Sequence, residues 1–204
     1  MKKESVIDYG EYVVAEEITK LLNAGNKVFK EYSVFAPLSR QEKGIDLIIY
    51  KKGVSKVATV QVKSSKSYVG IGDHNERTNY TWLNTFSMSD ENPADFYAIV
   101  GTSLALQDQK NIDNGLSIRV VDYSPMVLIY TSSEMKEELS KIRLKNNINQ
   151  DRFFGYRFRD EEDIVLSRGF VQGYNTLNNG SRERSKYVLK NRKDIFIDYF
   201  LYFS

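Results

Sequence analysis

The sequence predicts a mixed α/β fold, in which one amphipathic helix precedes a series of short strands. Residues 8–24 carry apolar side chains at helical spacing, and Gly25 follows them as a stop signal. Residues 57–63 alternate between apolar and polar side chains, as a half-buried strand does. Residues 95–101 form a short apolar run, which is typical of a buried strand.

Composition limits the chemistry that this chain can perform. Its 204 residues are enough for one domain with a sizeable core. Cysteine is absent and His74 is the single histidine, which excludes disulfides, thiolate zinc sites and histidine-rich metal sites. Any metal must be held mainly by oxygen ligands, which favours Mg²⁺ or Mn²⁺. The net charge of +2 neither establishes nor excludes nucleic-acid binding.

Hydropathy gives an expectation about location. No apolar stretch approaches the ~18 residues of a membrane span, and no apolar segment follows the charged first residues. We therefore expect a soluble cytoplasmic protein with no membrane partner.

The most informative stretch is residues 44–65, which predicts two strands joined by a glycine-containing turn. In the second strand, Gln61 and Lys63 share one face and Val62 points to the other, because side chains alternate along a strand. If the two strands pair, the face of Gln61 and Lys63 can meet Asp46, which opens the first strand. A carboxylate, an amide and an ammonium at one place favour a site for a metal ion and a phosphate.

The spacing of these residues resembles the active site of the PD-(D/E)XK nuclease superfamily in its Q-x-K variant. Gly44-Ile45-Asp46 and Val60-Gln61-Val62-Lys63-Ser64 match the two phrases that carry this site, and the likeness covers residues 8–101. Similar members are methylation-dependent restriction endonucleases, Holliday-junction resolvases and homing endonucleases of this fold. The resemblance implies a restriction-endonuclease-like core with a mixed central sheet flanked by helices. It also implies a metal-dependent endonuclease that hydrolyses DNA.

The resemblance further implies roles for individual residues. Asp46 would be the principal ligand of Mg²⁺, with Mn²⁺ as a substitute. Gln61 and the backbone carbonyl of Val62 would be further ligands, and Gln61 stands where the usual members have an acid. Lys63 would stabilise charge on the phosphate and help to position or deprotonate the attacking water. A first-helix glutamate often completes such a site, and helical geometry places Glu11 on the inward stripe of its helix.

Other roles for the acids of this helix stay open. Asp8 and Glu11 have the spacing of a capping box, so Glu11 could serve only to cap the helix. Glu17 lies at the other edge of the inward stripe and is the second candidate for the metal, whereas Glu16 faces outward.

Basic residues outside the central stretch are candidates for binding DNA. We expect residues 66–79 to form a polar loop beside the site. Residues 152–159 alternate basic and aromatic side chains, which suits phosphates and stacked bases but also a half-buried strand with a basic outer face. Residues 182–193 form a further basic cluster. The candidates from these three stretches are Lys66, His74, Arg77, Arg152, Arg157 and Arg184.

We expect a nuclease core over residues 1–145 and a C-terminal extension over residues 146–204. The extension ends in an apolar segment, which must pack on the core or on the second subunit of a homodimer. Further secondary structure is expected as strands at residues 27–35, 80–83, 116–121 and 126–130, and as a helix that starts with a capping box at Thr131 and ends near Leu144.

Two other functions compete with the endonuclease. The neutral Gln61 would suit a catalytically inactive nuclease-fold module that binds nucleic acid or a partner protein. The apolar C-terminal segment would suit a scaffold that mediates assembly.

Overall fold

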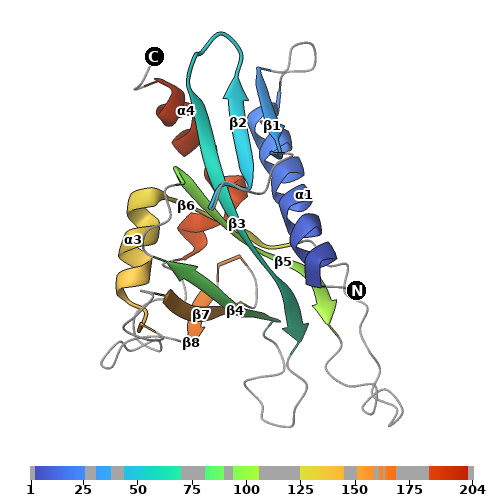
Figure 1. Cartoon of the computed structure of the whole chain (residues 1–204), viewed down its shortest axis with the longest axis vertical. Helices are drawn as coiled ribbons and strands as arrows, with labels where there is room; N and C mark the ends of the chain where they lie inside the picture. Colours follow the sequence, from blue (N-terminus) through green and yellow to red (C-terminus); the bar gives the residue numbers. More distant parts are fainter. Residues whose placement is uncertain are drawn as a thin grey trace.

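The computed structural model describes most of the chain in separate segments. These are residues 3–25, 31–37, 44–69, 81–89, 94–105, 125–144, 151–158, 161–162, 164–168 and 184–201. They form a mixed sheet with helices packed on it, which confirms the predicted α/β class (Figure 1). The strand expected at residues 116–121 lies outside the described residues.

The elements of the described segments have the following bounds. The helices are α1 (Lys3–Leu22), α3 (Ser132–Ser140) and α4 (Lys193–Leu201), with short 3-10 helices η1 (Ser185–Tyr187) and η2 (Leu189–Asn191). The strands are β1 (Tyr32–Phe35), β2 (Leu47–Lys51), β3 (Val57–Val69), β4 (Thr81–Ser89), β5 (Phe96–Ala105), β6 (Val127–Thr131), β7 (Asp151–Phe158) and β8 (Ile164–Arg168). Among the helices described, none has the length and apolar character needed to cross a membrane.

The long strand β3 connects all parts of the sheet (Figure 1). Its first residues pair antiparallel with β2, and its last residues, from Ser67 on, pair antiparallel with β4. Strand β5 runs parallel to β3 from the Val60 pair to the Tyr68 pair. The sheet continues from β2 to β1, from β5 to β6, and from β4 through β7 to β8.

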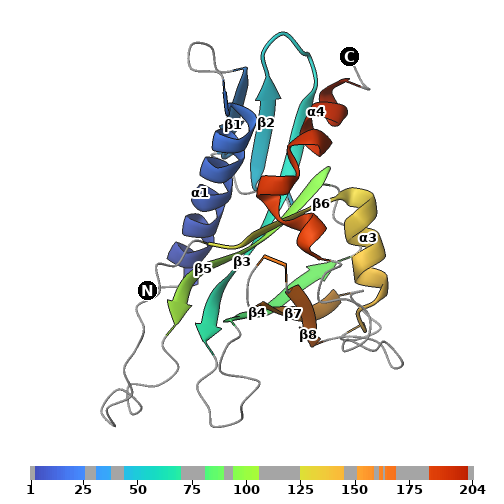
Figure 2. The same cartoon turned by 180° about the vertical axis from the view of Figure 1, so that it is seen from behind.

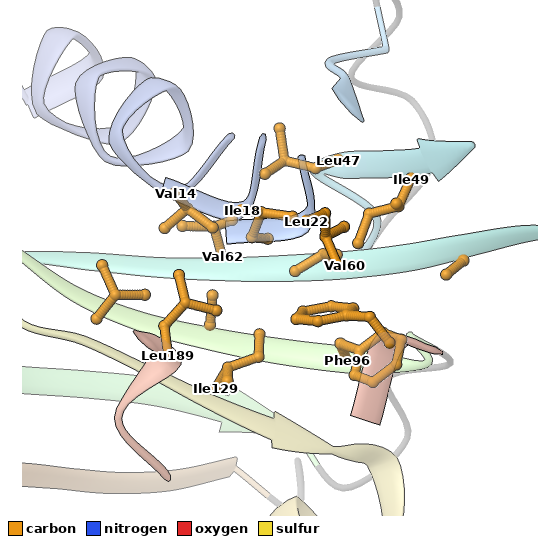
Figure 3. Packing of buried hydrophobic residues seen from close by; sticks show 14 of the residues in the cluster. Val14, Ile18, Leu22, Leu47, Ile49, Val60, Val62, Phe96, Ile129 and Leu189 are labelled. Carbon is orange, nitrogen blue, oxygen red and sulfur yellow. The ribbon is translucent and has the colours of Figure 1, made fainter. Parts of the chain in front are cut away.

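Helix α1 packs its apolar stripe onto one face of this sheet (Figure 3). Val14 and Ile18 are completely buried there against Val60 and Leu47. Each such side chain contributes about 1.5–3 kcal/mol when it leaves water. The stripe predicted from the sequence is thus confirmed, and it fixes which face of β2 and β3 is covered.

The C-terminal segment packs on the same face as α1. Phe196 and Phe200 of α4 are buried in the cluster that α1 forms with the sheet, and their rings contact Phe96 and Tyr32, respectively. Figure 2 shows α1 and α4 on the same side of the sheet. Helix η2 adds Leu189 to this cluster. The apolar end of the chain therefore packs on its own core.

A second cluster covers the opposite face of β5. Tyr97 and Ile99 point into it, together with side chains of β6, α3, β7, β8 and η1. Strands β7 and β8 extend the central sheet, so the described part of residues 146–204 is built onto the core.

Several element boundaries differ from the predicted ones. Helix α1 begins at Lys3, because nothing before Asp8 interrupts a helix; Asp8 is therefore internal and Glu11 does not cap the first turn. Residues 66–69 are strand and not loop, because pairing with β4 and β5 outweighs the low strand propensity of this polar run. Strand β4 extends over nine residues, well beyond the expected residues 80–83. The capping box at Thr131 is confirmed, and its helix ends at Ser140, before the expected Leu144.

A buried ion pair connects α3 to the segment before η1. Arg184 donates from Nε to Oε1 of Glu138 at 2.6 Å, and each side chain is only 2% exposed. The hydroxyl of Tyr156 donates to the same oxygen, and burial raises the pKa of this tyrosine well above its usual range. The expectation that Arg184 binds DNA is therefore wrong, because its guanidinium is enclosed and neutralised in the interior.

We predict that Glu138→Ala destabilises the protein by about 3–5 kcal/mol, because it leaves the charge of Arg184 buried without its carboxylate partner. Urea unfolding followed by circular dichroism measures this change. Glu137→Ala is the matched control, since Glu137 is the preceding residue and 65% exposed, and it should change stability by less than about 0.5 kcal/mol. Equal midpoints for the two variants would contradict the assigned role of the ion pair.

Candidate active site

The carboxylate of Asp46 marks the place where β2 separates from β3. The last pair before this point joins Leu47 to Val60, and the N–H of Asp46 donates to the Val60 carbonyl at 2.9 Å. Oδ2 of Asp46 then accepts the N–H of Val62 at 2.6 Å. A side-chain oxygen thus takes the place of a β2 carbonyl, and charge-assisted bonds of this kind are strong. Asp46 is held firmly against β3.

The edge of β3 next to Asp46 forms a gap in the sheet. Strand β2 pairs with β3 up to Val60, and β4 pairs with the same edge only from Ser67 onward. Among the described residues, no strand pairs with this edge over residues 61–66, which we call the β3 gap. The N–H and C=O of one residue point to the same edge of an extended strand. The Val62 carbonyl therefore faces the β3 gap together with the amide that Asp46 accepts.

Glu11 approaches Asp46 from the side of α1. Its carboxyl is half-buried, and its pKa is raised first by burial and further by the negative charge of Asp46. Glu16 and Glu17 instead form ion pairs with Lys20 on the exposed side of the helix, at 2.9 and 3.0 Å. Of these three acids, Glu11 is the one whose charge interacts with Asp46.

Gln61 and Lys63 leave β3 on the face opposite to α1. Gln61 is level with Tyr97 of β5 and is 4% exposed, whereas Lys63 is level with Ile99 and half-exposed. Within the part of the chain that the structure describes, Lys63 has no ion-pair partner. The structure therefore brings Asp46, Glu11 and the Val62 backbone together. Gln61 and Lys63 belong to the same strand but point to its other face, the one opposite to α1.

Two carboxylates and the Val62 carbonyl lie near the β3 gap, and the amide of Gln61 is on the opposite face of β3. Two carboxylates, an amide and a backbone carbonyl are the ligand types that Mg²⁺ and Mn²⁺ take. Among the described residues, no cluster of three or more acids or histidines suited to a metal exists. Burial raises the pKa of Glu11 and the negative charge of Asp46 raises it further, and a cation would relieve this repulsion.

The residues expected to bind DNA lie apart from this site or are not described. Arg152 is half-buried, and its guanidinium donates to the carbonyl of Ile142. Lys66 belongs to β3 and Arg157 to β7, but their side chains are outside the described ones. His74 and Arg77 lie outside the described residues altogether. Arg184 is in the interior, as described above.

The sequence did not predict the β3 gap or the hydrogen bond from the Val62 N–H to Asp46 at its edge. The signal was present in the polar run of residues 63–66, which interrupts the apolar alternation of the strand. We expected a loop to begin at the end of this run. A polar run of this kind also occurs where a strand stays extended but has no neighbouring strand on one edge, as β3 does between β2 and β4.

No family model, curated protein or solved structure matches this chain. Any assignment of function therefore depends on the geometry of the chain itself.

We predict that Asp46→Asn lowers the pKa of Glu11. Asparagine keeps an oxygen for the Val62 N–H but removes the negative charge, while burial persists and should hold the pKa of Glu11 above its ordinary value. Carbon-13 NMR titration of the glutamate carboxyl groups measures the change. Glu16→Gln is the control, because Glu16 pairs with Lys20, and it should leave the pKa of Glu11 unaltered. An unaltered pKa in Asp46→Asn would show that the two carboxyls do not interact.

Proposed function

We propose that this protein is a metal-dependent endonuclease of the PD-(D/E)XK type, which hydrolyses phosphodiester bonds of DNA. The observation that supports the proposal is the electrostatic interaction of Glu11 with Asp46 at the β3 gap. Two carboxyls that repel each other raise the free energy of the folded protein. Such pairs are typical of functional sites.

The arrangement of the core elements is a second line of support. Helix α1 precedes β1, β2 and β3, and β5 returns parallel to β3, in the order that a restriction-endonuclease-like core would have. One feature departs from the usual pattern, since β4 stands where members of this superfamily usually have a helix before the next core strand.

The proposed cofactor is Mg²⁺, with Mn²⁺ as a substitute. Asp46 and Glu11 would hold it, together with the amide oxygen of Gln61 and the Val62 carbonyl. When bound, the ion would polarise the phosphate and lower the pKa of a water molecule. Because the pKa of Glu11 is raised, a proton competes with the cation at this carboxyl, and metal affinity should increase as pH rises through that pKa.

The protein residues would orient the reacting groups. The Val62 N–H holds Oδ2 of Asp46, so this carboxylate needs no rearrangement when substrate arrives. Lys63 would approach the phosphate from the opposite side of β3, and its ammonium would stabilise the charge that develops there. Gln61 would offer its amide N–H to the phosphate or to the water.

DNA is the proposed partner, and a homodimer would supply two sites for two antiparallel strands. The dimer contact would have to come from a surface other than the buried side of α4, since Phe196 and Phe200 pack within their own chain.

A second candidate function is a nuclease-fold module that binds nucleic acid or a partner protein without turnover. The observation that favours it is the environment of Gln61, which is neutral and almost completely buried next to Tyr97. A buried amide is a weaker metal ligand than an exposed carboxylate. Measurements of metal binding and of cleavage together separate the two candidates.

We predict that the wild-type protein nicks supercoiled plasmid in Mg²⁺, and that Asp46→Asn, Glu11→Gln and Lys63→Ala each reduce the rate by about 100-fold or more, in the range that removal of one catalytic group produces. Gel electrophoresis over time measures the rates. Glu16→Gln should cleave within twofold of the wild type, because it removes a surface acid from the same helix. Equal rates in all variants would sink the assigned mechanism.

Binding of Mn²⁺, followed by electron paramagnetic resonance, supplies a readout that is independent of turnover. We expect binding in the wild type and weaker binding in Asp46→Asn. A wild type that binds DNA but neither takes up Mn²⁺ nor cleaves would favour the inactive module.

A further inference from the structure

Gly44 precedes Asp46 by two residues and has a backbone conformation that strands do not use. Its φ is positive, at 88°, whereas residues of antiparallel strands have φ near about −140°. A residue with a Cβ rarely adopts a positive φ, because its Cβ then approaches the neighbouring carbonyl oxygen too closely. The path of the chain just before β2 therefore calls for glycine.

The register of β2 and β3 shows what this conformation changes. Leu47 is level with Val60, so a β2 that continued backwards would bring Ile45 level with Val62. The Val62 N–H points to this edge and would then donate to the backbone carbonyl of Ile45. It donates instead to Oδ2 of Asp46 at 2.6 Å. The chain has left β3 before Asp46, and the side chain of Asp46 occupies the position that the main chain would have taken.

We propose that Gly44 is a positioning residue, whose positive φ turns the chain away from β3 so that the carboxylate of Asp46 accepts the Val62 N–H. Asp46 is fixed on β3 by its backbone as well, because its N–H donates to the Val60 carbonyl at 2.9 Å. Both bonds can form together only if the residues before Asp46 depart from the strand in the right direction. Gly44 sets that direction.

The consequence for catalysis rests on the proposed function. A displacement of a reacting group by about 1 Å can reduce a rate by about 100-fold. Gly44 has no side chain that could touch a metal ion or DNA, so it would influence metal binding and cleavage only through the carboxylate of Asp46.

Amide hydrogen exchange of Val62, followed by NMR, tests the positioning role without any contribution from cleavage. In Gly44→Ala we expect the Val62 amide to exchange about tenfold faster or more, relative to the Val60 amide of the same strand, because a bond to a charged acceptor is lost. The Val62 amide resonance should move toward its position in Asp46→Ala. When Asp46→Ala is already present, adding Gly44→Ala should change Val62 exchange by less than about twofold, because the two residues act through one bond.

Gly53→Ala is the matched control. Gly53 has a φ of 82° in the turn between β2 and β3, and a Cβ added there would meet nothing within 4 Å. Alanine resists this conformation, so the variant should lower the urea midpoint. It should leave the exchange of Val62 relative to Val60 within about twofold of the wild type, because Gly53 does not direct the chain before Asp46.

Gly44→Asn is the rescue variant. Asparagine adopts a positive φ more readily than most residues that have a Cβ. We therefore expect Gly44→Asn to retain more of the Val62 protection than Gly44→Ala does, although asparagine has the larger side chain.

Three results would overturn the proposal. The first is a Gly44→Ala variant in which the exchange and the resonance of Val62 match the wild type. The second is an equal acceleration of Val62 in Gly53→Ala, which would make the effect a general loss of stability. The third is a Gly44→Asn variant that loses the Val62 protection as completely as Asp46→Ala does.

Two measurements decide the question if Gly44→Ala does not fold. One is the Val62 exchange of Gly44→Asn. The other is the φ of Gly44 in the wild type, obtained from NMR couplings, and a negative φ there would refute the positioning role.

Mn²⁺ binding and plasmid nicking separate this proposal from the endonuclease. We expect Gly44→Ala to nick at least about tenfold more slowly than the wild type, and Gly53→Ala to nick within about twofold of it. If Gly44→Ala loses the Val62 protection but the wild type neither takes up Mn²⁺ nor nicks, the positioning role stands and the endonuclease fails. Nicking that depends on Asp46, with Val62 unaltered in Gly44→Ala, would leave the endonuclease and remove the role of Gly44.

Discussion

The sheet and the candidate site both depend on the long strand β3, which pairs with different strands along its length. Strand β3 pairs with β5 on one edge, while β2 and β4 use successive parts of its other edge. Between them lies the β3 gap, where the carboxylate of Asp46 holds the Val62 amide. A buried backbone N–H without an acceptor would destabilise the folded protein, and the carboxylate of Asp46 supplies the acceptor for the Val62 N–H. This bond also fixes a charged oxygen at the part of this edge where neither β2 nor β4 pairs with β3.

Apolar packing and a paired buried charge stabilise the sheet around the β3 gap. At the gap itself, two carboxyls of like charge lie near each other. Two apolar clusters cover the faces of β5, and the interior ion pair of Glu138 and Arg184 is satisfied by its partners. Glu11 and Asp46 instead bring two negative charges together where burial already disfavours them. The cost is small against the burial of α1 and α4. A folded protein can keep such a pair only when the surrounding packing holds it in place.

The sequence predicted those elements whose pattern is local. The stripe of α1, the alternation of residues 57–63 and the capping box at Thr131 each depend on residues a few positions apart, and the structure has all three. The extension of β3 to Val69 depends instead on distant strands that pair with a polar run. The burial of Arg184 depends on Glu138, 46 residues away, so a single arginine in a basic stretch gave no sign of it.

The same reasoning explains how much of the candidate site was readable. Asp46, Gln61 and Lys63 lie in or beside one hairpin, so their spacing predicted one group, and the inward direction of Glu11 followed from helical geometry. The structure brings Asp46 to the Val62 amide and points Gln61 and Lys63 to the face opposite to α1. The sequence did not show that Glu11 and Lys63 lie on opposite faces of β3. It also did not show that the pairing along one edge of β3 is interrupted between β2 and β4. Helices α1 and α4 cover one face of β2 and β3, and the opposite face of β1 and β2 keeps the exposed rings of Phe35 and Tyr50. A strand edge beside a packed face can therefore hold the carboxylates of Asp46 and Glu11 firmly.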